Sequence, residues 1–289
     1  MRVDIGGGVR LFFDVAGSSL EPTDEEMVDR PVLLVLHGGP GSDHSAFRPY
    51  FDRFADTHLV VYLDHRGQGR SDQRHDPSGW DLDTWADDVA RFCEALSIER
   101  PVVLGNSFGG FVAMHYGARH PDHPSKLVLM STQARRFTEE TAGRFEALGG
   151  PEARETYEAV FVRGEGTPEL VARYFELNLP LYNRRPSEFG PRRAWQNTRV
   201  LLHFDSSFDE LDLRTDLGQI ACPTLVLCGE DDPMTPPVAS RELHARLPEG
   251  LGSLEVLDDC GHGTYRDQPD RTEQILREFL APAGRDPLP

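Results

Sequence analysis

Short apolar runs recur along the chain and are separated by polar, glycine-rich stretches. The first two, Val3–Ile5 and Leu11–Val15, flank the glycine triplet at positions 6–8. This pattern is typical of two strands joined by a glycine turn. We therefore expect an antiparallel hairpin at the start, followed by a polar, acidic connection over residues 18–30.

Six further runs are rich in leucine and β-branched residues. They span Val32–Leu36, Leu59–Leu63, Val102–Leu104, Leu127–Met130, Thr224–Leu227 and Leu254–Leu257. Continuous apolar runs of this length indicate strands that are buried on both faces of a sheet.

Helical patterns lie between these runs. The clearest places Trp85, Val89, Phe92 and Leu96 on one face of a helix. Parallel strands need long crossover connections, so strands that alternate with helices predict a mostly parallel sheet covered on both sides. The expected fold class is therefore α/β.

The alternation breaks between about residues 133 and 214. Candidate helices span residues 139–148, 151–162 and 168–177, and prolines punctuate the stretch that follows. The strand pattern resumes after Pro223. We expect residues 1–132 and 215–289 to form the core, with residues 133–214 inserted as a helical cap.

The strongest motif is Gly105-Asn106-Ser107-Phe108-Gly109, which follows an apolar run and precedes a helical pattern. A tight turn from strand to helix exposes the serine hydroxyl, and glycines are needed where side chains would collide with the strand and helix. Ser107 is the predicted nucleophile. An ordinary glycine turn is the alternative.

A serine hydroxyl needs a base that is itself oriented by a carboxylate. His262 lies between two glycines after one predicted strand, and Asp231 and Asp232 follow another. We favour Asp232, with Asp231 left open; either could instead cap the next helix, and His262 could be an ordinary loop histidine. The order Ser, Asp, His is that of α/β-hydrolases.

A third element, His37-Gly38-Gly39-Pro40-Gly41, follows the run that ends at Leu36. Acyl transfer needs N–H donors for an oxyanion, and glycines let the backbone approach it closely. The backbone N–H groups of Gly39 and Phe108 are the expected donors. A phosphate-binding loop is disfavoured, because no Walker lysine follows.

The charge and composition limit the classes of binding partner and the compartment that we expect. The 289 residues carry a formal net charge of −18, which disfavours nucleic acid and anionic membranes as partners. Without a long apolar stretch or a signal peptide, we expect a cytoplasmic protein. Four scattered cysteines lack metal-binding or redox spacing, so we expect reduced, structural thiols. Cys260 could alternatively be a reactive thiol near His262.

These motifs, together with the stretch Asp64-His65-Arg66-Gly67-Gln68-Gly69-Arg70-Ser71, resemble the α/β-hydrolase superfamily. The HGGPG element resembles its prolyl iminopeptidase-like branch. The resemblance covers the core but not the cap. It implies an eight-stranded sheet, a helical cap, no cofactor and no metal. It also implies a triad of Ser107, Asp232 and His262, with an oxyanion hole at Gly39 and Phe108.

Substrate specificity is encoded in the cap, where the resemblance ends. Aminopeptidases of this branch bind the substrate amine with carboxylates, but Pro233 follows Asp232 here. Candidate amine-binding acids are Glu139, Glu140, Glu176, Asp205, Asp209 and Glu210. Arginines are frequent in the cap, and we expect most of them to pair with nearby acids. Its aromatic residues predict an apolar pocket roof.

We expect a serine hydrolase acting on a small molecule or short peptide. A prolyl iminopeptidase-like aminopeptidase or amidase ranks slightly above a carboxylesterase or lactonase. A lidded small-molecule receptor and an enzyme that cleaves carbon–carbon bonds or oxidises without a cofactor are alternatives on the same fold.

Overall fold

The apolar runs pair into one eight-stranded sheet in the computed structural model, which describes residues 1–72, 77–185, 196–208 and 211–281, with the backbone alone over 205–208. The strands are β1 (Arg2–Asp4), β2 (Arg10–Ala16), β5 (Val32–Leu36), β6 (Leu59–Leu63), β7 (Val102–Asn106), β8 (Lys126–Met130), β9 (Thr224–Gly229) and β10 (Gly252–Leu257). Their order is β1-β2-β6-β5-β7-β8-β9-β10. β2 runs antiparallel to β1 and β6, and the strands from β6 to β10 are parallel, so the predicted sheet is confirmed.

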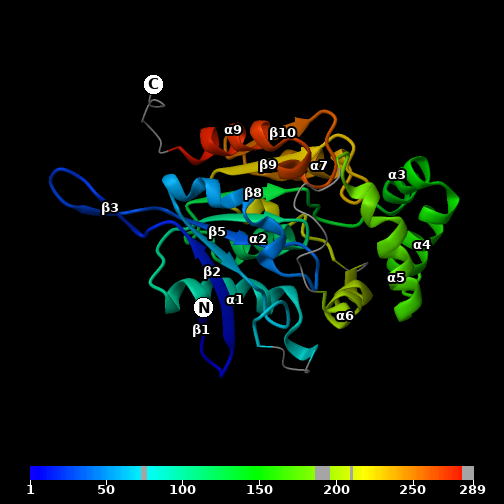
Figure 1. Cartoon of the computed structure of the whole chain (residues 1–289), viewed down its shortest axis with the longest axis horizontal. Coiled ribbons are helices and arrows are strands. Elements are labelled where there is room, and N and C mark those ends of the chain that lie inside the picture. Colours follow the sequence, from blue (N-terminus) through cyan, green and yellow to red (C-terminus); the bar gives the residue numbers. More distant parts are fainter. Residues whose placement is uncertain (73–76, 186–195, 209–210, 282–289) are drawn as a thin grey trace.

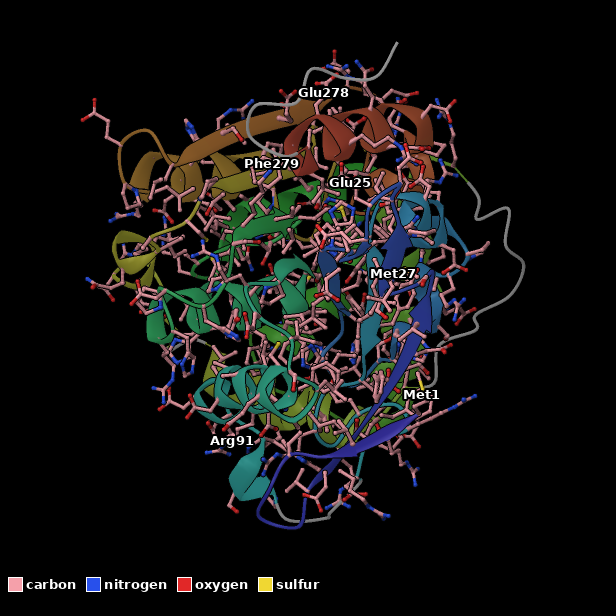
Figure 2. The ribbon with its side chains drawn as sticks, turned by 90° about the vertical axis from the view of Figure 1, so that its left-hand side faces the viewer. Met1, Glu25, Met27, Arg91, Glu278 and Phe279 are labelled. Carbon is pink, nitrogen blue, oxygen red and sulfur yellow. The ribbon has the colours of Figure 1, made fainter. Side chains whose placement is uncertain are left out.

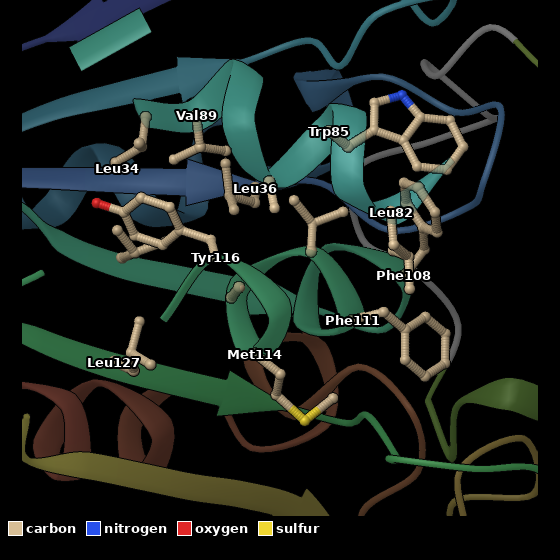
Figure 3. Close-up of a cluster of buried hydrophobic side chains, with 14 of the residues drawn as sticks. Leu34, Leu36, Leu82, Trp85, Val89, Phe108, Phe111, Met114, Tyr116 and Leu127 are labelled. Atoms are coloured by element: carbon tan, nitrogen blue, oxygen red, sulfur yellow. The ribbon is translucent and has the colours of Figure 1, made fainter. Parts of the chain in front are cut away.

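Alternate residues of each strand point to opposite faces of the sheet and build two cores. Leu34 and Leu36 of β5 pack with Trp85 and Val89 of α1 (Leu82–Ala95), and α2 (Phe108–Arg119) covers the same face (Figure 3). Leu33 and Val35 of β5 point to the other face of the sheet. They pack there against η1 (His44–Phe47), η2 (Tyr50–Asp56), α8 (Thr264–Asp267) and α9 (Pro269–Leu280). The sheet is therefore covered on both faces, with α1 and α9 on opposite sides (Figure 1).

Two expectations about the strands are wrong. β10 is the last strand of the sheet, and most of its residues are partly exposed, so it is not buried on both faces. The polar connection over 18–30 contains a second, two-stranded sheet of β3 (Leu20–Pro22) and β4 (Met27–Asp29). Glu25 and Met27 lie at this exposed hairpin (Figure 2). Two strands of three residues each are too short to show an alternating hydrophobic pattern.

Helices fill the chain between β8 and β9. They are α3 (Thr138–Gly149), α4 (Pro151–Phe161), α5 (Pro168–Leu177), η4 (Leu179–Tyr182), α6 (Thr198–Phe208) and η5 (Asp216–Gln219); α7 (Pro237–Arg246) follows β9. The helices from α3 to α5 share their own core, which includes Phe145, Tyr157 and Tyr174, and stand at one end of the sheet (Figure 1). α6 was not predicted. The division of the chain at residues 132 and 215 stays a prediction.

None of the described helices combines the length and apolar character needed to cross a membrane.

The β5 core provides a direct stability test. Leu34 is fully buried, whereas Leu20 on β3 is 44% exposed. Leu34→Ala should lower the free energy of unfolding by about 2–5 kcal/mol, because it leaves a cavity between the sheet and α1. The matched change Leu20→Ala should stay within about 0.5 kcal/mol. Urea unfolding of both variants measures the difference, and equal losses would contradict the packing described.

Candidate active site

Ser107 occupies the turn between β7 and α2. Its backbone has φ 54° and ψ −118°, a left-handed region that residues with a side chain rarely adopt. Three hydrogen bonds hold it there. Its N–H donates to Met130 O at 2.9 Å, and its carbonyl accepts from Gly110 N and from the Thr132 hydroxyl, both at 2.8 Å. The strained turn is thus fixed by the neighbouring strand β8 and the segment that follows it.

Glycines make this turn possible because the helix starts in contact with the strands. A Cβ on Gly105 would overlap the carbonyl of Gly109, and a Cβ on Gly109 would overlap the carbonyl of Leu36 at the end of β5. Both positions therefore exclude any side chain, as the motif predicts.

Asp232 and His262 meet in the loops after β9 and β10. Asp232 is fully buried, and its Oδ2 lies 2.8 Å from Nδ1 of His262. The same carboxylate accepts hydrogen bonds from the backbone N–H groups of Met234 and Thr235 and from the Thr235 hydroxyl. A carboxylate can only accept, so Nδ1 carries the proton in this bond and Nε2 of a neutral ring is left as the basic nitrogen.

The structure distinguishes the two adjacent aspartates. Asp231 is 39% exposed and lies 3.4 Å from the guanidinium of Arg184. Asp232 turns inward to the histidine. Asp232 is thus the aspartate that the structure brings to His262.

The loop that carries His262 is bound to the segment after η4. The backbone N–H of His262 donates to Tyr182 O at 2.6 Å, and the Tyr182 ring stands edge-on to the imidazole. Gly263 N donates to Asn183 Oδ1 at 3.0 Å. The position of the histidine therefore depends on residues in the helical insertion, which motif analysis did not find.

Asp267 is a second buried carboxylate in this loop. It accepts hydrogen bonds from the backbone N–H groups of Gly261 at 2.7 Å and of Arg184 and Arg185 at 2.9 Å. Its side chain is fully buried. Asp267 thus joins the insertion to the histidine loop. This role could not be predicted, because an aspartate in a short helix has no characteristic spacing.

Two histidines hold the glycine loop after β5 in place through hydrogen bonds. His37 Nδ1 donates to Gly38 O at 2.7 Å, and His37 Nε2 accepts from His65 N at 3.3 Å. Burial lowers the pKa of His37, which keeps it neutral, as both hydrogen bonds require. Gly39 has φ 129°, and a Cβ there would lie 2.9 Å from Ser42 N. Only glycine fits this position.

A cavity of about 330 Å³ joins these elements. Gly39, Ser107 and His262 line one part of it. Most of the other lining residues have aromatic or aliphatic side chains. Those that lie in helices or at helix ends include Phe111, Tyr157, Phe161, Tyr174, Phe175, Leu179, Tyr182, Leu201 and Phe204. An apolar roof is therefore present, as expected from the aromatic residues of the cap. Of those residues, Phe137 and Phe145 do not line the cavity, and Trp195 lies outside the described residues.

The proposed amine-binding acids do not line this cavity where their side chains are described. Glu139 and Glu176 are exposed and pair with Arg154 and Arg173, and Glu140 is exposed. The side chains of Asp205, Asp209 and Glu210 lie outside the described part. Among the described residues that line the cavity, Asp43 is the only carboxylate, and its Oδ1 accepts from Ser45.

Several cap arginines pair with nearby acids, as expected. Arg154, Arg163 and Arg173 each contact two or more glutamates of the insertion. The alternative of a reactive Cys260 is wrong. All four cysteines are free and buried, and burial raises the pKa of the Cys260 thiol, which suppresses the nucleophilic thiolate.

Comparison with known proteins identifies the family. The sequence profile of the alpha/beta hydrolase fold family matches residues 31–269. The chain belongs to this family. This hydrolase is 28% identical to a proline iminopeptidase from Heyndrickxia coagulans, over 93% of this chain and 97% of that protein. The expected resemblance to the prolyl iminopeptidase-like branch is thus confirmed.

Two solved structures share the fold of this hydrolase. A proline iminopeptidase from Mycobacterium smegmatis superposes with a TM-score of 0.73 at 22% identity, covering 97% of each chain. An esterase from Exiguobacterium antarcticum superposes with a TM-score of 0.68 at 20% identity, covering 96% of this chain and 98% of that one.

Asp267 offers a test of how the histidine loop is held. Asp267→Asn replaces one acceptor oxygen by an NH2 group that faces backbone donors, so it should lower the free energy of unfolding by about 1–3 kcal/mol. The exposed neighbour Asp270 provides the control, and Asp270→Asn should change it by less than about 0.5 kcal/mol. Chemical denaturation measures both. An unchanged Asp267→Asn variant would show that the three hydrogen bonds contribute little.

Proposed function

We propose that this enzyme cleaves an ester or amide bond through an acyl-enzyme formed on Ser107. The hydrogen bond between Asp232 and His262 carries the proposal, because it leaves Nε2 as the basic nitrogen of a histidine that shares a cavity with Ser107. The exposed turn supports the same role, since the strained backbone presents the hydroxyl to the cavity.

In this mechanism the Ser107 oxygen attacks the substrate carbonyl while His262 Nε2 takes the hydroxyl proton. Asp232 holds the ring and stabilises the imidazolium that forms. His262 then returns the proton to the leaving group, and the acyl group stays on Ser107. Water attacks this ester, with His262 again as base, and releases the acid.

The negative charge that develops on the carbonyl oxygen needs N–H donors. Phe108 is the first residue of α2, so its N–H has no acceptor inside the helix, and it follows the nucleophile directly. Gly39 lines the cavity beside Ser107. We assign these two N–H groups to the oxyanion hole.

The cavity supports an apolar acyl group as the substrate. Eight of the aromatic and aliphatic side chains that line it come from residues 133–214, which would cover the nucleophile as a cap. A substrate amine would find one carboxylate among the described lining residues, Asp43, already hydrogen-bonded to Ser45. These features favour a carboxylesterase or lactonase.

An aminopeptidase is the second candidate. The relatives named proline iminopeptidase favour it, as they match nearly the whole chain. Among the described residues that line the cavity, Asp43 is the carboxylate that could bind the free amine of the substrate.

A substrate panel tests the proposal. It comprises proline 4-nitroanilide, its N-acetylated form, short and medium acyl esters and a lactone. We expect steady turnover of medium acyl esters, and Ser107→Ala should reduce it at least about a thousandfold. Ser253→Ala, on an exposed position of β10, is the matched control. Preference for the free-amine anilide would establish the second candidate, and full activity of Ser107→Ala would refute the mechanism.

The aspartate pair gives a separate prediction. Asp232→Asn should lower kcat by about 10⁴-fold, because an amide can no longer hold the histidine in the required tautomer. Asp231→Asn removes only an exposed contact with Arg184, so its kcat should remain near that of the unchanged enzyme. Steady-state kinetics on one ester compares them, and a larger loss for Asp231→Asn would contradict the assignment.

A further inference from the structure

Arg266 is a positively charged side chain in the wall of the cavity. It belongs to α8, is partly buried and lines the same cavity as Ser107 and His262. Its guanidinium carbon lies 5.2 Å from the centre of the Tyr265 ring. Within the part of the chain that the structure describes, this guanidinium forms no ion pair with a carboxylate. The mechanism described above makes no use of its charge.

The acids that could neutralise Arg266 are bound elsewhere. Asp267 is the next residue, but its oxygens accept from three backbone N–H groups of other segments. Arg48, which also lines the cavity, differs from Arg266 in having two carboxylate partners, Asp14 and Asp52. A partly buried cation without a counter-ion is a feature that an anionic group of a ligand can satisfy.

Asn183 supplies a second hydrogen-bond donor in the same wall. Its Oδ1 accepts from the backbone N–H of Gly263 at 3.0 Å, which identifies the oxygen and makes Nδ2 the other end of the amide. Nδ2 donates to no acceptor among the described residues. Asn183 also lines the cavity, so its NH2 group is available to a ligand there.

Gly263 brings the two side chains together. A Cβ at this glycine would lie 2.5 Å from Asn183 Oδ1 and 3.2 Å from Cδ of Arg266. Both side chains therefore flank the residue that directly follows His262. Neither the guanidinium nor Nδ2 is among the sealed polar atoms of the described chain, so a ligand in the cavity can reach both.

The chemistry of these donors selects the ligand group. A guanidinium presents N–H donors in one plane, and a carboxylate accepts from them and from a neighbouring amide at the same time. In the proposed mechanism His262 returns its proton to the leaving group. A group held beside the glycine that follows His262 therefore belongs to the leaving portion, while the apolar walls surround the acyl group.

We propose that Arg266 and Asn183 form a subsite that binds a carboxylate on the leaving portion of the substrate. The inference rests on the proposed hydrolase function and narrows its substrate class. The preferred substrate joins an apolar acyl group to a hydroxy acid or an amino acid.

Matched esters test this inference. Hexanoyl glycolate carries a carboxylate on its leaving portion, and hexanoyl glycolamide carries a neutral amide of similar shape. The ratio of their kcat/KM values, carboxylate over amide, should fall roughly tenfold or more in Arg266→Gln, because glutamine cannot form the ion pair. Asn183→Asp keeps an acceptor for Gly263 N but replaces the donor by a like charge, so the ratio should fall at least as far.

Arg271 supplies a matched control, since it is exposed on α9 and does not line the cavity. Arg271→Gln removes one positive charge and should keep the ratio. A second pair, monoethyl adipate and its neutral amide, places the carboxylate on the acyl portion, and its ratio should not depend on Arg266. If Arg271→Gln lowers the glycolate ratio as much as Arg266→Gln does, or if only the adipate pair depends on Arg266, the inference is wrong.

A binding measurement separates this inference from the hydrolase mechanism. Ketones in which CH2 replaces the ester oxygen of the glycolate pair present no bond to hydrolyse, and calorimetry on Ser107→Ala gives their Kd. The carboxylate ketone should bind roughly tenfold more tightly than its amide, and adding Arg266→Gln should remove the difference. Equal Kd values would overturn the subsite whatever the kinetics show. Hydrolysis that survives Ser107→Ala would instead refute only the serine mechanism.

Discussion

The close approach of α2 to the ends of β5 and β7 is the constraint on which the site depends. Gly105 and Gly109 leave no room for a side chain, so helix and strand touch through their backbones. This contact forces Ser107 into its left-handed conformation and points it into the cavity. It also places the start of α2 directly after Ser107, where the first N–H groups of the helix have no acceptor within the helix itself. The cost of the strained residue is offset by the three hydrogen bonds around it.

The second requirement is that loops far apart in the sequence meet at one end of the sheet. Parallel strands bring the segments after β5, β7, β8, β9 and β10 to the same edge. The insertion then completes the site, because Tyr182 accepts from the backbone of His262 and Asp267 joins both segments. A movement of this insertion would therefore displace His262. Aromatic and aliphatic side chains from the same insertion line the cavity that His262 also lines.

Much of this arrangement could be predicted from the sequence, because fixed backbone geometry leaves recognisable motifs. The sheet strands, the turn at Ser107 and the loops of Gly39 and His262 follow from apolar runs and glycines. The sequence pattern favoured Asp232 but left Asp231 open, since adjacent residues differ in which way packing turns them. α6 and the short β3–β4 hairpin also escaped detection, because neither leaves a clear apolar pattern. The role of Asp267 escaped because it depends on contacts with a distant segment.

The proposed function depends on one serine, Ser107, acting as the nucleophile. A fluorophosphonate probe reacts covalently with an activated serine, and mass spectrometry of a digest locates the adduct. The account predicts a single adduct on the peptide that contains Ser107, and its loss in Asp232→Asn, where the base is no longer oriented. An adduct on another residue, or labelling of Ser107 that survives the loss of His262, would contradict it.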